Sequence, residues 1–468
     1  MKPASAPPSH EPVLTPAALS RFGLPTLLLL TILAYLNSFA GVWQFDDHAV
    51  LLADPRVQSL SAWWQSLPHI RPLFKLSVAM QHQFDAGLFG FHLFNLALHL
   101  ANTLLLFRFL QILLAQHVRK PSPLALLITA VFALHPAQTE VVTYLSGRSV
   151  ALEGFGLLLA LNLWQHWLIN GKQHSLLWLL PALLIALGSR ESAVVAPLWL
   201  AWLWFCYRDG SRRVMWFALA AATGLLIVVL LLPRYRELLW LALQWRDLES
   251  LLAVQTQAIV HLFAVAVGWQ ALNADPVLSV APLASGRGIA CAVAVLALLV
   301  LAWRQRQQRT LLWLAVCWLA LSWLPTHSLF VRLDPVNDRQ LYLALPGITL
   351  LLLLPLKVAA NRMFRAANLQ SLPALLSVMV AVALSLTLAG ATRSRNTVYH
   401  SETAFWQDVV QKAPANARGW NNLGMAYQQT GHLAAAKQAF EQALVVRPDY
   451  RRAAVNLRLL RRQLAPSR

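Results

Sequence analysis

Long apolar runs separated by short loops are the feature that most constrains the fold of this chain. A helix that crosses a membrane needs about 20 mostly apolar residues. Only 12% of the 468 residues are charged, against roughly 25% in soluble domains, which excludes a soluble enzyme and a disordered chain. The three cysteines lie inside apolar runs, so no disulfide framework is expected. We therefore predict an α-helical polytopic membrane protein with eleven spans, at approximately 23–40, 89–115, 122–134, 149–169, 174–188, 191–207, 214–232, 286–303, 310–325, 340–357 and 372–391.

The basic loops between these runs predict the orientation, because Lys and Arg are enriched on the cytoplasmic side. If residues 1–22 are a disordered cytoplasmic tail, every loop expected inside is basic. This holds only if the apolar stretch 251–270 does not cross, so we expect that stretch in or at the outer interface. The transmembrane domain is then 23–391, and the C-terminal residues 392–468 lie outside. The outer loops on this layout are 41–88, 135–148, 233–285 and 326–339.

The end of the chain carries a repeat signature. Residues 417–450 fit the tetratricopeptide pattern, in which Gly424 lets two helices approach closely and Pro448 ends the second helix. Only one full repeat is visible, so flanking helices at 401–414 and 451–464 are expected to complete its core. This extracytoplasmic domain could bind a protein or anionic partner, or could simply pack beside the lipid head groups.

Two adjacent carboxylates, Asp46 and Asp47, directly follow the first expected span. One carboxylate at the outer surface can remove a proton from an acceptor hydroxyl, while the other orients it or holds a metal. Asp47 could instead be a helix N-cap, a position that Asp favours. Both interpretations stay open on the residues alone.

Several arginines on the outer side are candidates for binding a lipid phosphate, because the guanidinium group matches phosphate with two parallel hydrogen bonds. Each could instead anchor a loop or form an ion pair, as Arg190 with Glu191 or Arg339 with Asp338. The four candidates are Arg71, Arg148, Arg190 and Arg339.

His135 and Glu140 open the second large outer loop. Their spacing is not typical of a metal site on a helix, and we predict no metal ligands. The sequence contains no nucleotide-binding loop and no zinc finger.

An ordered series of motifs resembles a known family. The series is Phe45-Asp46-Asp47, Arg71-Pro72-Leu73, Phe91-His92-Leu93-Phe94-Asn95-Leu96 with His99, Phe132-Ala133-Leu134-His135-Pro136 with Thr139-Glu140-Val141-Val142, Gly147-Arg148, Gly188-Ser189-Arg190-Glu191, and Asp338-Arg339 with Leu341-Tyr342-Leu343 and Pro346. Followed by the repeat, it resembles the transmembrane-and-tetratricopeptide O-mannosyltransferases (TMTC) over most of the chain. Arg190 stands where that family has Lys, and Asp338 where it has Glu. The repeat tail is also shorter than in the animal proteins, which suggests a bacterial relative.

The resemblance implies a GT-C type glycosyltransferase that takes a sugar from a polyprenyl-phosphate carrier on the outer face. Asp46 is then the catalytic base, and Asp47 orients Asp46 or the acceptor. The four arginines are candidates for the carrier phosphate. His135, Glu140 and Glu191 are candidates for shaping the sugar or acceptor pocket.

The same resemblance sets the expected partners. These are the lipid bilayer of a bacterial inner membrane, the polyprenyl-phosphate sugar donor, and a protein or glycolipid acceptor that could dock on the tetratricopeptide domain. No nucleic acid and no cofactor are expected, and dependence on a divalent metal is left open.

Three other functions fit parts of the sequence. The chain could transfer a whole oligosaccharide, or act as a ligase or polymerase for surface glycans. It could instead be a membrane-anchored assembly platform without catalytic activity, which would tolerate substitution of Asp46. A transporter fits less well, because the acidic residues gather outside rather than at mid-membrane.

Overall fold

The computed structural model describes residues 22–208, 212–244, 248–308, 310–327, 334–366 and 372–464. Nearly all of these residues are helical and none of them forms a strand, so the predicted α-helical class is confirmed. The expected cytoplasmic tail 1–22 lies outside the described residues except for its last residue. The helices that precede the repeat region are α2 (Leu24–Tyr35), α3 (Leu60–Gln65), α4 (Pro72–Gln83), α5 (Gly87–Leu114), α6 (Pro121–Leu134), α7 (Thr139–Val142), α8 (Arg148–Asn170), α9 (His174–Ser189), α10 (Ala196–Tyr207), α11 (Arg212–Leu231), α12 (Pro233–Gln244), α13 (Leu248–Ala266), α14 (Gly286–Arg304), α15 (Leu311–Trp323), α16 (Leu345–Ala366) and α17 (Leu372–Asn396).

Short 3-10 and π turns join these helices at the end of the bundle that carries the outer loops. The repeat region that follows is built from four helices. The short turns are η2 (Leu36–Ala40), η3 (His48–Leu52), η4 (Pro55–Val57), η5 (Pro136–Gln138), η6 (Leu145–Gly147), η7 (Glu191–Val195), η8 (Asp338–Leu341) and η9 (Thr397–His400). The repeat helices are α18 (Glu402–Lys412), α19 (Ala417–Gln429), α20 (Leu433–Val446) and α21 (Arg451–Leu464).

Within the described residues, five helices are long and apolar enough to cross a membrane, or six if the bent pair α6 and 136–142 is one span. Several other expected spans correspond to apolar helices of 10–17 residues. The count of eleven spans therefore stays a prediction. The segment Glu249–Ala266 of α13, which we expected at the interface, is one of the five long helices.

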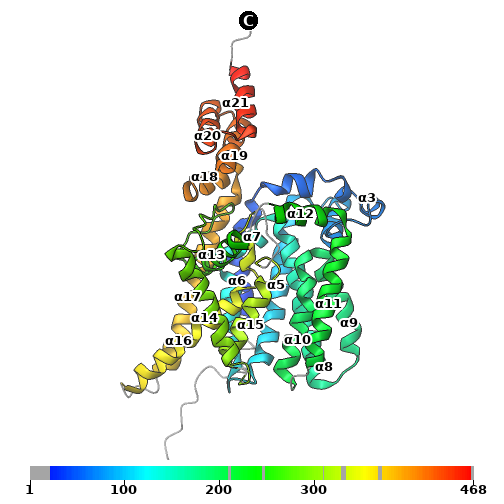
Figure 1. The fold of residues 1–468 in the computed structure, drawn as a ribbon, viewed down its shortest axis with the longest axis vertical. Helices are drawn as coiled ribbons and strands as arrows, with labels where there is room; N and C mark the ends of the chain where they lie inside the picture. Colours follow the sequence, from blue (N-terminus) through cyan, green and yellow to red (C-terminus); the bar gives the residue numbers. More distant parts are fainter. Residues whose placement is uncertain are drawn as a thin grey trace, which may run out of the picture.

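The long helices run side by side, and smaller elements cover one end of the bundle (Figure 1). At that end lie α3, α7 and α12, and the repeat helices α18–α21 project beyond it. α17 runs along the side of the bundle and leads through η9 into α18. The loops that carry the candidate residues and the C-terminal repeat therefore share one end of the molecule.

The repeat helices share an apolar core with the outer loops. Tyr399, Phe405 and Trp406 pack in one cluster with Tyr144 and with Ala274, which comes from the segment between α13 and α14. Burial of these side chains holds the repeat against the bundle.

Inside the repeat, α19 packs closely on α20. A Cβ added at Gly424 would lie 2.5 Å from the Phe440 ring, so only glycine fits this crossing. The close approach that the sequence predicted is therefore present.

Candidate active site

The two carboxylates of the first outer loop have different surroundings. Asp47 is fully buried, and its Oδ2 accepts a hydrogen bond from the Gln44 N–H at 3.0 Å. Its Oδ1 accepts from the N–H and the hydroxyl of Ser146 at 2.8 and 2.5 Å. Although Asp47 precedes η3, its side chain makes no capping bond there, so the N-cap interpretation is wrong. Asp47 instead fastens its loop to the turn that precedes α8.

Burial raises the pKa of Asp47 to about 7, although three hydrogen bonds oppose the rise. The neighbouring Asp46 adds a smaller upward contribution through its charge. A carboxylate in this state is held by the backbone and is shielded from solvent, which suits a residue that positions a loop.

Asp46 is half-buried, and no described residue forms a hydrogen bond with its carboxylate. Its backbone N–H donates to the Tyr144 hydroxyl at 3.0 Å. The carboxylate is therefore held by its backbone and remains available to accept a proton from a substrate.

Tyr144 belongs to a tight turn that ends at Gly147, where no larger residue fits. A Cβ added at Gly147 would lie 2.3 Å from the carbonyl oxygen of Glu140. This close approach explains the glycine at position 147 in the turn whose Tyr144 hydroxyl accepts the Asp46 N–H.

Arg339 reaches the same turn from η8. Its guanidinium carbon lies 5.2 Å from the centre of the Tyr144 ring. Asn337 accepts hydrogen bonds from the N–H and the Nε–H of Arg339 at 2.9 and 2.8 Å. The two terminal amino groups of Arg339 donate to no described residue, which leaves the prongs of the guanidinium free for an anion.

The charges around Arg339 show which candidate residues lie together. Burial lowers the pKa of Arg339, but Tyr144, Glu140 and Asp46 outweigh this effect and raise it, whereas the positive charge of Arg71 opposes them. Asp46, Glu140, Arg71 and Arg339 therefore form one electrostatic cluster, although they come from four separate segments.

Glu140 and Asp338 line the buried side of this cluster. The Tyr399 hydroxyl donates to Glu140 Oε1 at 2.5 Å, which ties α7 to the start of the repeat region. Asp338 accepts from the Asn273 N–H at 3.0 Å, and burial raises its pKa to about 8. Among the described residues Asp338 bonds to Asn273 and Arg339 bonds to Asn337, so the alternative interpretation of Arg339 as the ion-pair partner of Asp338 is wrong.

A second group flanks the cluster. Arg71 forms a two-pronged ion pair with Glu191, with Nε to Oε2 at 2.8 Å and Nη2 to Oε1 at 2.6 Å. The Tyr235 hydroxyl donates to the same Glu191 at 3.2 Å. Arg71 has φ of 53°, a left-handed conformation that is unusual for a residue with a side chain and is found at functional sites.

Arg190 lies next to this pair along the chain. Its Nε is 3.7 Å from Glu153 of α8, and its Nη1 donates to Ser149 at 3.3 Å. Arg190 is buried. Because Glu153 and Ser149 both belong to α8, these contacts link the start of η7 to α8.

Arg148 and His135 bond to residues other than Asp46 and Arg339. Arg148 is fully buried, donates to Asn95 Oδ1 at 2.8 Å, and lies between the rings of Phe91 and Phe94. His135 accepts from the Ala137 N–H through Nδ1, and its Nε2 lies 3.1 Å from the Ala266 carbonyl oxygen. Both side chains join helices within the bundle.

Sequence reasoning missed Tyr144, Asn337 and Tyr235. Each is an isolated polar residue in a loop or at a helix start, and only contacts distant in sequence give it a role. No group of three potential metal ligands occurs in the part of the chain that the structure describes.

Comparisons with known proteins agree with the resemblance seen in the motifs. The tetratricopeptide repeat family matches residues 417–450. The chain is 30% identical to protein O-mannosyl-transferase Tmtc1 of Drosophila melanogaster over 194 residues, 38% of this chain and 22% of that protein. It is 20% identical to a protein O-mannosyl-transferase of Caenorhabditis elegans over 464 residues, 91% of this chain and 62% of that protein.

A third relative is protein O-mannosyl-transferase Tmtc2 of Drosophila melanogaster, 30% identical over 193 residues, 36% of this chain and 20% of that protein. No solved structure matches the chain significantly. The chain thus spans 20% to 62% of the length of these three relatives. The expected likeness to the TMTC proteins is confirmed.

Proposed function

We propose that this relative of the protein O-mannosyl-transferases is a membrane glycosyltransferase that moves a sugar from a polyprenyl-phosphate carrier to an acceptor hydroxyl on the outer face. One observation carries the proposal. The Asp46 N–H donates to the Tyr144 hydroxyl, and the Arg339 guanidinium lies 5.2 Å from the centre of the same ring. Among the described residues, neither the Asp46 carboxylate nor the terminal amino groups of Arg339 have a hydrogen-bond partner. A base and an anion site beside each other are what transfer from a phosphate-linked donor needs.

Asp46 is the proposed general base. It accepts the proton of the acceptor hydroxyl as that oxygen forms a bond to the anomeric carbon of the sugar. The bond between that carbon and the phosphate oxygen breaks, and the carrier phosphate leaves as an anion. Removing the proton in the transition state contributes about 100- to 10,000-fold to such reactions.

Arg339 is the proposed partner of the leaving phosphate. Its Nε is held by Asn337, so the prongs are already oriented when the donor arrives, and no reorganisation is needed as charge develops. Arg71 lies on the flank in a two-pronged ion pair with Glu191, to which the Tyr235 hydroxyl also donates. It is the second proposed contact of the leaving phosphate.

Glu140 and Asp47 are proposed as supports. The charge of Glu140 acts on Arg339 and raises its pKa, so Glu140 is proposed to keep this guanidinium in its charged form. Asp47 fixes the turn that carries Tyr144 through its bonds to Ser146. Neither residue needs to touch the sugar for this role.

The membrane placement is part of the proposal. We place the end of the bundle with α3 and α12 on the outer side, with the repeat beyond it and eleven spans of GT-C type. Exposed tryptophans at this end, Trp64 on α3 and Trp240 on α12, support only an interface there, because tryptophan is enriched at both membrane surfaces. The choice of the outer surface rests on the basic loops expected on the cytoplasmic side.

We keep α13 at the outer interface. The Ala266 carbonyl oxygen at its C-terminal end lies beside His135, which follows α6. Its Gln257 side chain bonds both the N–H and the carbonyl of Ala281, at 3.0 and 2.8 Å, which folds the following segment back along the helix.

The test compares wild type with Asp46→Asn in a host that lacks its own copy. Intact masses of extracytoplasmic proteins and of lipid-linked glycans are measured by mass spectrometry. A sugar-sized mass that disappears in the variant, at normal membrane levels of the protein, supports the transferase and identifies the acceptor. Identical masses in both pools would overturn the assignment and favour a non-catalytic assembly platform.

A further inference from the structure

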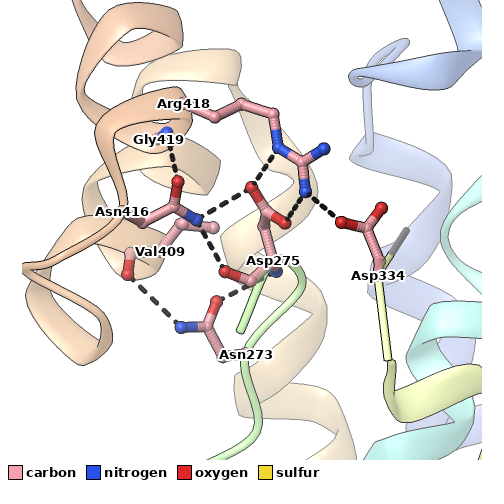
Figure 2. Close-up of polar contacts among 7 residues, drawn as sticks. All are labelled: Asn273, Asp275, Asp334, Val409, Asn416, Arg418 and Gly419. Atoms are coloured by element: carbon pink, nitrogen blue, oxygen red, sulfur yellow. Dashed lines mark hydrogen bonds and ion pairs between the residues drawn. The ribbon is translucent and has the colours of Figure 1, made fainter. Parts of the chain in front are cut away.

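Arg418 of the repeat region binds two outer loops at once. Arg418, in the first turn of α19, donates from Nε to Asp275 Oδ2 at 2.8 Å and from Nη2 to Asp275 Oδ1 (Figure 2). The same Nη2 donates to Asp334 Oδ1 at 3.0 Å. Asp275 follows α13 and Asp334 precedes η8, so one guanidinium bridges two loops that are distant in sequence.

The start of α19 supports the same junction. Asn416 accepts from the Gly419 N–H at 2.8 Å as the N-cap, and its Nδ2 donates to the carbonyl and the Oδ2 of Asp275 at 2.8 and 2.9 Å. Asn273 donates to the Val409 carbonyl at 3.3 Å (Figure 2). Asp275 and Asn416 are both buried. Removing a partner of Asp275 would leave a buried carboxylate without its ion pair, which destabilises the folded protein strongly.

The junction continues to the loop that carries Asp46. The Arg418 guanidinium lies 5.6 Å from the centre of the Phe45 ring, and that ring meets Trp406 of α18 edge-on at 5.1 Å. The carbonyl oxygen of Tyr399 accepts from the N–H of Val42 at 3.0 Å and from Gln44 Nε2 at 3.1 Å. The residues just before Asp46 therefore rest on the repeat region.

We infer that Arg418 is a positioning residue, through which the repeat region holds the Asp46 loop and the η8 loop in fixed relation. The repeat region then forms part of the structure around the proposed active site, in addition to any role in binding partners. Ordering three loops opposes folding through lost conformational entropy, and the two-pronged contact offsets that loss. The consequence for catalysis rests on the proposed function, whereas the docking itself does not.

Amide hydrogen exchange on the full-length protein in detergent tests the docking without any assay of activity. In Arg418→Ala we expect exchange in 42–48 and 271–276 to become roughly tenfold faster, while α19 and α20 keep their protection. Arg418→Lys keeps the charge but loses the two-pronged geometry of the guanidinium. Its exchange rates in the same segments should lie between those of wild type and Arg418→Ala. Arg447→Ala, at an exposed arginine of the same repeat, is the matched control and should leave both loops unchanged.

Transferase kinetics test the positioning role, with a polyprenyl-phosphate sugar as donor probe. We expect kcat to fall about tenfold in Arg418→Ala with the KM for the donor unchanged, and Arg418→Lys to recover part of it. Unchanged exchange in 42–48 and 271–276 would overturn the docking inference, and loosened loops with an unchanged kcat would overturn the positioning role. Faster exchange of these loops in Arg418→Ala, together with a wild-type protein that shows no transferase activity, would instead count against the proposed function alone.

Discussion

The buried carboxylate of Asp47 accepts hydrogen bonds from both the N–H and the hydroxyl of Ser146, at 2.8 and 2.5 Å, across 99 residues of sequence. The two residues join the first outer loop to the turn that carries Tyr144. Because Tyr144 accepts the Asp46 N–H, the position of the proposed base depends on a neighbour that takes no part in proton transfer.

Asp46→Asn should abolish sugar transfer without loss of fold. The amide cannot accept the acceptor proton, so we expect kcat to fall by about 100- to 10,000-fold. Turnover with a polyprenyl-phosphate sugar is the measurement. Asp85→Asn changes an exposed aspartate that also has positive φ, 46°, a conformation that asparagine tolerates, and it should keep full activity. Equal activity in the two variants would contradict the assignment.

Asp47 should make stability depend on pH in a defined direction. Burial raises its pKa from 3.8 to about 7, so the folded protein retains a proton that the unfolded chain releases. Its contribution to stability is fully present below the unfolded pKa and is lost as the pH rises through the folded value. Asp47→Asn lacks this titration.

The thermal unfolding temperature of Asp47→Asn relative to wild type should therefore increase from about pH 5 to about pH 8. The corresponding change in unfolding free energy is on the order of 1–4 kcal/mol. A difference between the two proteins that stays constant across this range would show that Asp47 is already ionised at low pH.

Two substitutions at Arg71 separate its backbone from its side chain. Arg71→Ala and Arg71→Gly both remove the ion pair with Glu191, but only glycine adopts φ of 53° without cost. Arg71→Gly should therefore be more stable than Arg71→Ala by about 1 kcal/mol. Both should lose donor affinity to the same extent. Thermal unfolding and the KM for the donor are the two measurements, and equal stabilities would rule out backbone strain at this position.

Arg339→Ala should weaken transition-state binding of the donor phosphate. A charge-assisted hydrogen bond contributes about 1.5–3 kcal/mol, so kcat/KM should fall roughly 10- to 150-fold. Arg339→Lys should restore part of this loss, because one positive charge remains but the fork is gone. Arg306→Ala is the control, since Arg306 is exposed and lies over Trp303, far along the chain from this cluster. A control that loses as much activity as Arg339→Ala would show a general effect of charge.

Gly424→Ala should destabilise the repeat. The added methyl group would meet the Phe440 ring at 2.5 Å, and such overpacking costs about 1–3 kcal/mol. Gly390→Ala on α17 is the matched control, because nothing lies within 4 Å of a Cβ there. Hydrogen exchange of α19 and α20 measures the effect. Protection that survives in Gly424→Ala would mean that the ring moves aside.

Several features could be predicted from the sequence because they depend on neighbours close along the chain. The apolar runs determined the helical class, since a backbone among apolar side chains must satisfy its own hydrogen bonds. The tetratricopeptide pattern, which includes Gly424 and Pro448, located the repeat at residues 417–450. Both patterns are local, so no knowledge of the tertiary fold was needed.

The roles of single polar residues were decided only by the tertiary structure. The sequence could not tell whether Asp47 capped a helix or held a distant turn, because an aspartate suits both. It could not pair Arg71 with Glu191, 120 residues away, or Arg418 with Asp275, 143 residues away. The same type of side chain is fully buried between two rings at Arg148, whereas at Arg339 it is the proposed contact of the donor phosphate. Burial and the geometry of partners brought together from distant segments decide between these roles, and neither is encoded in the local pattern of residues.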